Sequence, residues 1–304
     1  MADTKPSVTE NMLALLIIFV VSLLGFVSNG LSLHLTVTNS HFRNAYGTLC
    51  TAILLCNIQT MAVILIWGAV VLLTNSRELS SQTSPIALIP GCFANVSFYG
   101  SLLLNLLIAV NRYCALTHPL KYHSFWSVQK ARIAAIIAYF LGFLPCFPSI
   151  FEPCTLIFNM ELDLRWSYSN TSCGYINSMF DLIFCISTLT TAGCINFITL
   201  FRIRNYSKSR KMKVDQLITR SINRNRDIGF FKQSCTSGFT IMIVGIFFNV
   251  GPHFLTNKWA LFAATTICWQ ISNTLDGFVV LFFSWHYVRN SSTNIVMDLR
   301  RHGW

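Results

Sequence analysis

The chain has 304 residues, of which 53% are hydrophobic and 11% are charged, and its formal net charge is +11. Soluble globular domains have about 25% charged residues, so this composition excludes an ordinary water-soluble protein. Apolar runs of about 20 residues divide the chain, and a helix of that length crosses a bilayer.

The sequence predicts an all-α membrane protein, a seven-transmembrane helix bundle that forms a single domain over residues 1–304. A backbone in lipid must satisfy its own hydrogen bonds, so each apolar run is expected to form a spanning helix. The helices are expected near residues 12–38, 48–73, 88–114, 133–151, 175–200, 234–256 and 260–286. An odd number of spans places the two termini on opposite sides of the membrane.

Basic residues orient the predicted bundle. Of the 22 Lys and Arg residues, 18 fall in segments that are inside when the N-terminus is outside, and ten of these lie between Arg202 and Lys232. Because basic residues collect on the cytoplasmic side, we expect the N-terminus outside and the C-terminus inside. The positive charge is then expected to face the lipid bilayer and not nucleic acid.

Helices one, two and seven each carry a polar residue at depth, namely Asn29, Asn57 and Asp276. We interpret them as a structural polar hub in which Asp276 faces Asn57 or Asn29 through water. Interhelical polar bonds are worth only about 0.6–2 kcal/mol in membranes, so the hub favours specific packing more than stability.

Helix three has candidate residues at both ends. Phe98 and Tyr99 lie in its outer half, where aromatic side chains serve core packing or the wall of an apolar pocket. Its inner end reads Asn111-Arg112-Tyr113. An arginine at this place either snorkels to the lipid headgroups or acts as a switch that meets a cytoplasmic partner.

The second outer loop contains Cys154 and Cys173, and Cys92 lies at the start of helix three. The outer side is oxidising, so we expect one disulfide with one thiol left over. Cys154–Cys173 would close the loop on itself, whereas Cys92–Cys173 would join it to helix three. The sequence leaves both open, with a slight preference for the first. Asn170 heads a predicted glycosylation site in the same loop.

Asp181 lies about six residues into helix five, roughly 9 Å from its outer end. A carboxyl group there meets a cationic ligand, accepts hydrogen bonds from neighbouring helices, or is protonated. The candidate ligand-binding residues are Phe98, Tyr99, Asp181, Trp259 and Trp269. Core packing is the competing interpretation for each aromatic residue among them.

Pro252 follows Gly251 and either ends helix six or kinks it. Residues 234–251 already span about 27 Å, which favours the end of the helix. The segment 201–233 is the longest predicted inner loop, with helices five and six extending into it in the receptor interpretation given below.

The sequence contains no HExxH, no GxSxG, no Walker loop and no spaced Cys/His metal set. Intramembrane acidic residues are few, which disfavours a proton or ion pathway. We therefore expect no enzymatic activity, no cofactor and no metal site.

Residues 111–122, NRYCALTHPLKY, resemble the Asp-Arg-Tyr region and second inner loop of rhodopsin-like G-protein-coupled receptors. More specifically, they resemble the nematode serpentine chemoreceptors of the srx family. Further similar segments occur in the same order along the chain as in that family. They are residues 25–30, then Cys154, Trp166 and Cys173 with Phe180-Asp181, then 225–234, and then Trp269 with 275–278. The resemblance covers roughly residues 15–290.

The resemblance implies a chemosensory receptor in the plasma membrane of a sensory neuron. Such a receptor binds a small-molecule chemical cue in an outer pocket and activates a heterotrimeric G protein at its inner loops, by shifting a conformational equilibrium. Asn111, Arg112 and Tyr113 would then be the residues of activation and G-protein coupling.

Some positions depart from the rhodopsin-like pattern. Asn111 stands where an acid is usual, which excludes an acid–arginine lock beside Arg112, and helix seven lacks the Asn-Pro-x-x-Tyr element. Asn57 replaces the usual acid of a sodium site. Two alternatives remain open: a seven-helix ligand-gated channel or transporter, and a receptor paralogue that folds without signalling.

Overall fold

The computed structural model describes residues 8–76, 78–151, 154–160, 164–208 and 214–301. Within these ranges, seven helical segments are long and apolar enough to cross a membrane. The predicted fold class, an all-α bundle of seven spans, is therefore confirmed.

The spans follow one another in the chain, and the connection between the fourth and fifth contains a β-hairpin. The fourth and seventh spans are each built from several shorter helical pieces, and the other five are single helices. In chain order the spans are α1 (Val8–Thr38), α2 (Ala45–Thr74), α3 (Pro85–Thr117), α5 (Val128–Leu141) with α6 (Phe143–Cys146) and η3 (Phe147–Ile150), α7 (Ser172–Lys208), α8 (Val214–Asn249), and α9 (Lys258–Phe262) with the π-helical turn η5 (Ala263–Ile267) and α10 (Cys268–Arg301). The connections contain the short helices η1 (Ser40–Phe42), η2 (Glu78–Ser80), α4 (Pro119–Phe125) and η4 (Gly251–His253).

The ends of the last three spans differ from the predicted ends. The α7 helix continues to Lys208, and α8 begins at Val214, so both helices extend into the predicted inner loop 201–233 beyond the ends of the apolar runs, as the receptor interpretation expected. The prediction used apolar runs, and hydropathy does not mark a helix that continues beyond the apolar run. At the other end, α8 ends at Asn249 instead of residue 256, because Pro252 lies in the short 3-10 turn that follows. Most side chains of 201–233 lie outside the described part.

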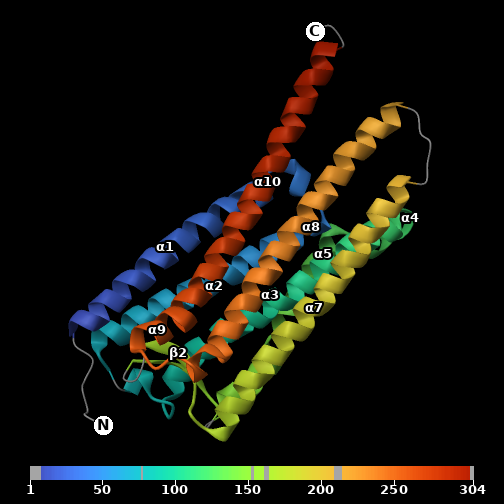
Figure 1. Ribbon diagram of the computed structural model, residues 1–304. Coiled ribbons are helices and arrows are strands. Elements are labelled where there is room, and N and C mark those ends of the chain that lie inside the picture. The colour runs from blue at the N-terminus through green and yellow to red at the C-terminus, as the bar shows by residue number, and fades with distance from the viewer. Residues whose placement is uncertain (1–7, 77, 152–153, 161–163, 209–213, 302–304) are drawn as a thin grey trace.

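The bundle has two distinct ends (Figure 1). The end with the start of α1, the α9 helix and the β-strands is called the hairpin end below, and the opposite end, with the C-terminus of α10, is called the Arg112 end. The α3 helix packs against α2, α5 and α7, and α1 packs against α2 and α10.

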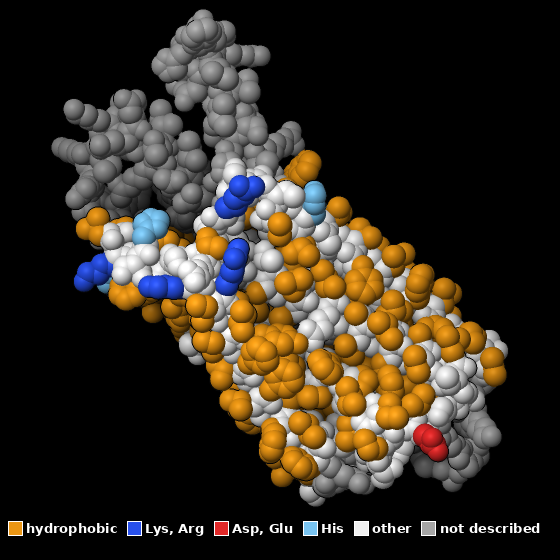
Figure 2. Space-filling model, turned by 180° about the vertical axis from the view of Figure 1, so that it is seen from behind, with side chains coloured by type: hydrophobic (Ala, Val, Ile, Leu, Met, Phe, Trp, Pro, Cys, Tyr) orange, Lys and Arg blue, Asp and Glu red, His pale blue; other side chains and the backbone are white. Residues whose placement is uncertain are grey.

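Apolar side chains cover the flank of the bundle, and polar ones lie inside it. Figure 2 shows hydrophobic side chains along the flank, with Lys and Arg side chains gathered toward one end. Exposed residues on the flank include Leu16, Ile66 and Phe197, whereas Asn29 and Asn57 are buried. This arrangement suits lipid as the surrounding solvent, because the polar groups find partners within the protein.

A β-hairpin closes the hairpin end. Strands β1 (Leu156–Asn159) and β2 (Arg165–Tyr168) pair antiparallel, and Phe158 and Trp166 on them are completely buried. Their rings meet edge to face, with centroids 5.8 Å apart. They belong to the same core as Phe262 of α9 and Trp269 of α10, so the hairpin is packed into the mouth of the bundle.

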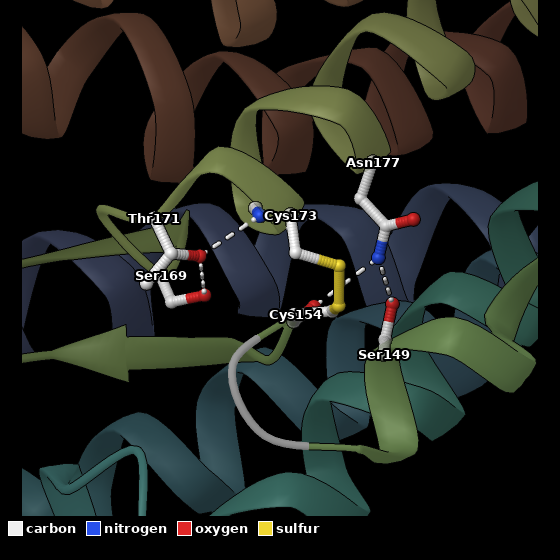
Figure 3. Close-up of a disulfide and its surroundings, with 7 residues drawn as sticks. Ser149, Cys154, Ser169, Thr171, Cys173 and Asn177 are labelled. Atoms are coloured by element: carbon white, nitrogen blue, oxygen red, sulfur yellow. Dashed lines mark hydrogen bonds between the residues drawn. A yellow bond between two sulfur atoms is a disulfide. The ribbon is translucent and has the colours of Figure 1, made fainter.

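A disulfide between Cys154 and Cys173 joins the start of the hairpin to the start of α7 (Figure 3). This is the pairing that the sequence favoured, and Cys92 keeps a free thiol. The Asn177 amide donates to the hydroxyl oxygen of Ser149 and to the carbonyl oxygen of Cys154, at 3.2 Å in both cases. The hairpin is thus held to α7 and to the end of the fourth span.

Candidate functional site

The predicted polar hub is assembled by direct contacts and not through water. Asn57 Nδ2 donates to Asp276 Oδ2 at 2.9 Å and to Asn29 Oδ1 at 3.1 Å. Ser237 of α8 donates to the other oxygen, Asp276 Oδ1. The buried carboxyl group therefore joins α2, α8 and α10 near the middle of the bundle.

The same region holds α1 close to α10. Asn29 Nδ2 donates to the Asn273 carbonyl at 3.0 Å, and Ser32 Oγ donates to the Gly277 carbonyl at 2.6 Å. A Cβ atom on Gly277 would lie 2.9 Å from the backbone nitrogen of Asn29. Residues 25–30 and 275–278, which carry part of the family resemblance, therefore form one tight interhelical seam.

Asn111, Arg112 and Tyr113 each contact a different helix at the Arg112 end. Asn111 Nδ2 donates to the Tyr122 hydroxyl of α4 at 3.1 Å. The guanidinium carbon of Arg202, on α7, lies 5.6 Å from the centroid of the Tyr113 ring, in the geometry of a cation–π contact. Arg112 turns toward α2, so the three neighbouring residues connect α3 to three other elements.

Arg112 is the first member of a hydrogen-bond chain that crosses the bundle. Its Nη2 donates to the Tyr46 hydroxyl at 2.9 Å, and that hydroxyl donates to Gln233 Oε1 at 3.0 Å. The chain connects α3 through α2 to α8. About one turn farther along α8, Ser237 bonds Asp276, so two neighbouring ties fix α8 to the bundle.

A small cavity lies at the hairpin end between α3, α7, α8 and α10. The residues that line it are Asn95, Phe98, Asp181, Val244, Gly245, Phe248, Asn249 and Trp269. Trp269 meets Phe98 and Phe248 edge to face, with ring centroids 6.3 and 5.6 Å apart. The wall of the cavity is thus mostly apolar and aromatic with a few polar groups, which is typical of a small-molecule site.

The hairpin reaches this cavity through Tyr168. The Asn95 amide donates to the Tyr168 hydroxyl at 2.9 Å, and that hydroxyl donates to Asp181 Oδ2. Burial raises the pKa of the Tyr168 hydroxyl above its ordinary value, so this group stays protonated and keeps its donor. The Asp181 side chain, only 6% exposed, accordingly accepts a bond from the loop that covers it.

The structure brings together three of the five predicted ligand-binding residues. Phe98, Asp181 and Trp269 line the cavity at the hairpin end. Tyr99 is 1% exposed and packs edge to face on Phe184 of α7, and Trp259 packs on Phe262 of α9. The last two positions therefore serve core packing in this arrangement.

Two more cavities continue the first one along α3. The second shares Phe98, Val244 and Trp269 with the first and extends to Asp276. The third begins at Asp276 and ends at Arg112. Residues of α8 line all three cavities.

Several residues of these sites carry no signal that sequence reasoning used. Tyr46 lies just before the predicted second span, Phe248 lies in the sixth apolar run, and Asn95 lies in the third. Gln233 and Tyr122 lie within segments that carry the family resemblance, and only the fold assigns partners to them. In the described part of the chain, no three His, Cys, Asp or Glu side chains gather as they would around a metal ion.

Comparison with known proteins gives consistent results. The family model described as "Serpentine type 7TM GPCR chemoreceptor Srx" matches residues 19–284. Serpentine receptor class X-43 of Caenorhabditis elegans is 22% identical over 216 residues, which cover 67% of this chain and 65% of that protein, just under two thirds of its length. Serpentine receptor class X 45 of the same nematode is 22% identical over 296 residues, covering 90% of this chain and 78% of that protein.

A solved structure supports the fold. The crystal structure of squid rhodopsin matches with a TM-score of 0.71 and covers 96% of this chain and 88% of that chain. The sequence identity is 11%, so this likeness concerns the arrangement of the helices alone.

Proposed function

Because the chain belongs to the Srx family of serpentine seven-transmembrane GPCR chemoreceptors, we propose that it binds a small-molecule cue at the hairpin end and activates a heterotrimeric G protein at the Arg112 end. As a member of a receptor family it is not an enzyme, and its seven apolar helices make it an integral membrane protein. Its proposed location is the plasma membrane of a sensory neuron.

The observation that carries the proposal is that α8 extends from the cavity at the hairpin end to the hydrogen bonds at the Arg112 end. At the hairpin end, Val244 and Phe248 of this helix line the cavity with Asp181. Toward the Arg112 end, Gln233 and Ser237 of the same helix make the two ties described above. A ligand that fits the cavity better in one position of α8 shifts the equilibrium between two positions by its differential affinity.

We place the hairpin end outside the cell. The disulfide and the exposed Asn170 lie at this end, and both suit an oxidising, glycosylating compartment. At the other end, the exposed basic residues Arg43 and Lys121 belong to the connections, and the exposed Lys130 lies in the first turn of α5. This orientation follows the positive-inside rule.

The test is a signalling assay with the full chain in cells, screened with small volatile and water-soluble compounds. Arg112→Ala is expected to abolish the G-protein response to an active compound while surface expression persists. Arg132→Ala, which removes an exposed arginine from α5, is the matched control and should leave the response unchanged. Undiminished signalling by Arg112→Ala would refute the switch role of this residue.

One observation favours a second candidate, a receptor that binds its cue without coupling to a G protein. Asn111 is engaged with Tyr122 and cannot pair with Arg112 as an acid would. Saturable ligand binding without any G-protein response, in cells that hold the relevant G proteins, would support this second function.

A further inference from the structure

We propose that the cavity at the hairpin end takes a small protonated amine with an apolar group, and that Asp181 is its counter-ion. The inference rests on the proposed receptor function and names the chemical class of its ligand. It is carried by the charge of the cavity, by its aromatic wall and by the engagement of its other polar groups.

The charge of the cavity is unbalanced. Asp181 is buried, and the residues described around the cavity include no Lys, Arg or His. A neutral hydroxyl, that of Tyr168, donates to Oδ2, and the hydrogen bonds of the described residues leave Oδ1 to a ligand. A buried carboxylate without a cation is costly, so an ammonium group that enters the cavity supplies the missing charge.

The aromatic wall suits the same ligand. Phe98, Phe248 and Trp269 line the cavity with Asp181, and Trp269 contacts both phenylalanines. An ammonium group within about 6 Å of a ring centroid is attracted by the ring quadrupole, most strongly for tryptophan. The rings also offer an apolar surface to the remainder of the ligand.

The other polar side chains of the cavity are already engaged within the protein. Asn95 donates to Tyr168. Asn249 accepts a hydrogen bond from Ser178 at 2.7 Å and donates to the Gly245 carbonyl at 2.9 Å. Asp181 is therefore the polar anchor, which favours a ligand with one charged group. The cavity is small and is lined by side chains of four helices, which favours a compact molecule, such as a single ring with a short aminoalkyl chain.

The experiment compares amines with alcohols of the same shape. The full-length receptor, purified in detergent, is heated with benzylamine or 2-phenylethylamine and, in parallel, with benzyl alcohol or 2-phenylethanol at neutral pH. We expect the amines to raise the melting temperature in a saturable way and the alcohols to leave it unchanged, because a ligand that binds the folded state stabilises it.

Variants then test the named residues. Asp181→Asn keeps the shape of the side chain and should weaken amine binding at least ~30-fold. Glu10→Gln is the matched control, since it removes a carboxylate at the same end of the bundle but outside the cavity, where Glu10 pairs with Lys258 at 3.1 Å. Phe248→Leu should weaken amine binding roughly 2- to 30-fold and stands in if Asp181→Asn does not fold.

Three results would overturn the inference: no melting shift with either amine at millimolar concentration, an equal shift with the matching alcohol, or full amine binding by folded Asp181→Asn. The proposed receptor function is separable from it. If a neutral compound elicits a response that requires Arg112, the receptor function is supported and the amine proposal is not. If amines bind without any signalling, the amine proposal is supported and the receptor function is not.

Discussion

Among the residues whose side chains are described, two buried carboxyl groups lie in the spans, and their partners suit different roles. Asp276 accepts hydrogen bonds from Asn57 and Ser237, one on each oxygen, so its demand for donors is met within the bundle. Asp181 accepts from Tyr168, which belongs to the covering hairpin. The first carboxyl group is therefore suited to holding helices together and the second to recognising a ligand.

The Tyr46 hydroxyl is the link between Arg112 and α8, and its removal tests whether this link restrains the receptor. Tyr46→Phe is expected to raise ligand-independent signalling. Loss of ~0.6–2 kcal/mol of interhelical hydrogen bonding shifts the equilibrium roughly 3- to 30-fold. The measurement is basal G-protein activity, normalised to the amount of receptor at the cell surface.

Tyr122→Phe is the control for this prediction, because the Tyr122 hydroxyl bonds Asn111 and makes no described contact with α8. An unchanged or lower basal activity for Tyr46→Phe would show that the chain from Arg112 to Gln233 does not restrain α8.

At the residue scale, the sequence identified the polar residues in the middle of the spans, but it did not identify the uncharged residues that connect Arg112 to α8. Asp276, Asn57 and Asn29 stood out because polar side chains are rare and costly in lipid, and they do meet. Tyr46 and Gln233 are separated by 187 positions and carry no charge, so only the packing of α2 against α8 makes them neighbours.

Among the elements, the hairpin depends on a close approach to α3. A Cβ atom on Gly91 would lie 2.0 Å from the carbonyl oxygen of Leu156, so Gly91→Ala must displace the hairpin or bend the helix. We expect a loss of about 1–3 kcal/mol of folding free energy, seen as a lower melting temperature of the purified receptor.

Gly193→Ala in α7 is the matched control, since no heavy atom lies within 4 Å of the added methyl group. It should leave stability unchanged or raise it slightly, because alanine favours a helix over glycine by about 0.5–1 kcal/mol. A Gly91→Ala receptor as stable as this control would contradict the close approach.

The disulfide holds the same hairpin by a covalent bond. Cys173→Ser opens a loop of 19 residues and is expected to cost about 3 kcal/mol, as loop closure entropy predicts for this length. Cys92→Ser keeps the disulfide and should leave the melting temperature nearly unchanged. An equal loss in both variants would mean that the pairing differs from Cys154–Cys173.

At the element scale, the apolar runs located all seven spans, because lipid demands a continuous apolar stretch. They did not locate the ends of α7 and α8, whose polar continuations carry no hydropathy signal. Gly251 and Pro252 did mark the end of α8. The π-helical turn η5 could not be foreseen, since its residues, Ala263–Ile267, are ordinary for a helix.

For the whole molecule, the orientation is the property that fixes which end meets the cue. Asn170 lies exposed near the hairpin, so the receptor made in animal cells is expected to lose mass on a gel after glycosidase treatment. Asn170→Gln should lose this shift. Asn205 heads a second Asn-x-Ser sequence, toward the opposite end of α7, and Asn205→Gln should keep the shift. A shift that depends on Asn205 would invert the bundle and favour a channel or transporter.

Three small cavities lie in a row between Asp181 and Arg112. Every one of them has a wall formed by α8, so a displacement of that helix enlarges some of the empty space and closes the rest. Hydrostatic pressure favours whichever arrangement leaves less void. The two positions of α8 in the proposed mechanism should therefore differ in molar volume, and pressure alone should change their populations in the absence of any ligand.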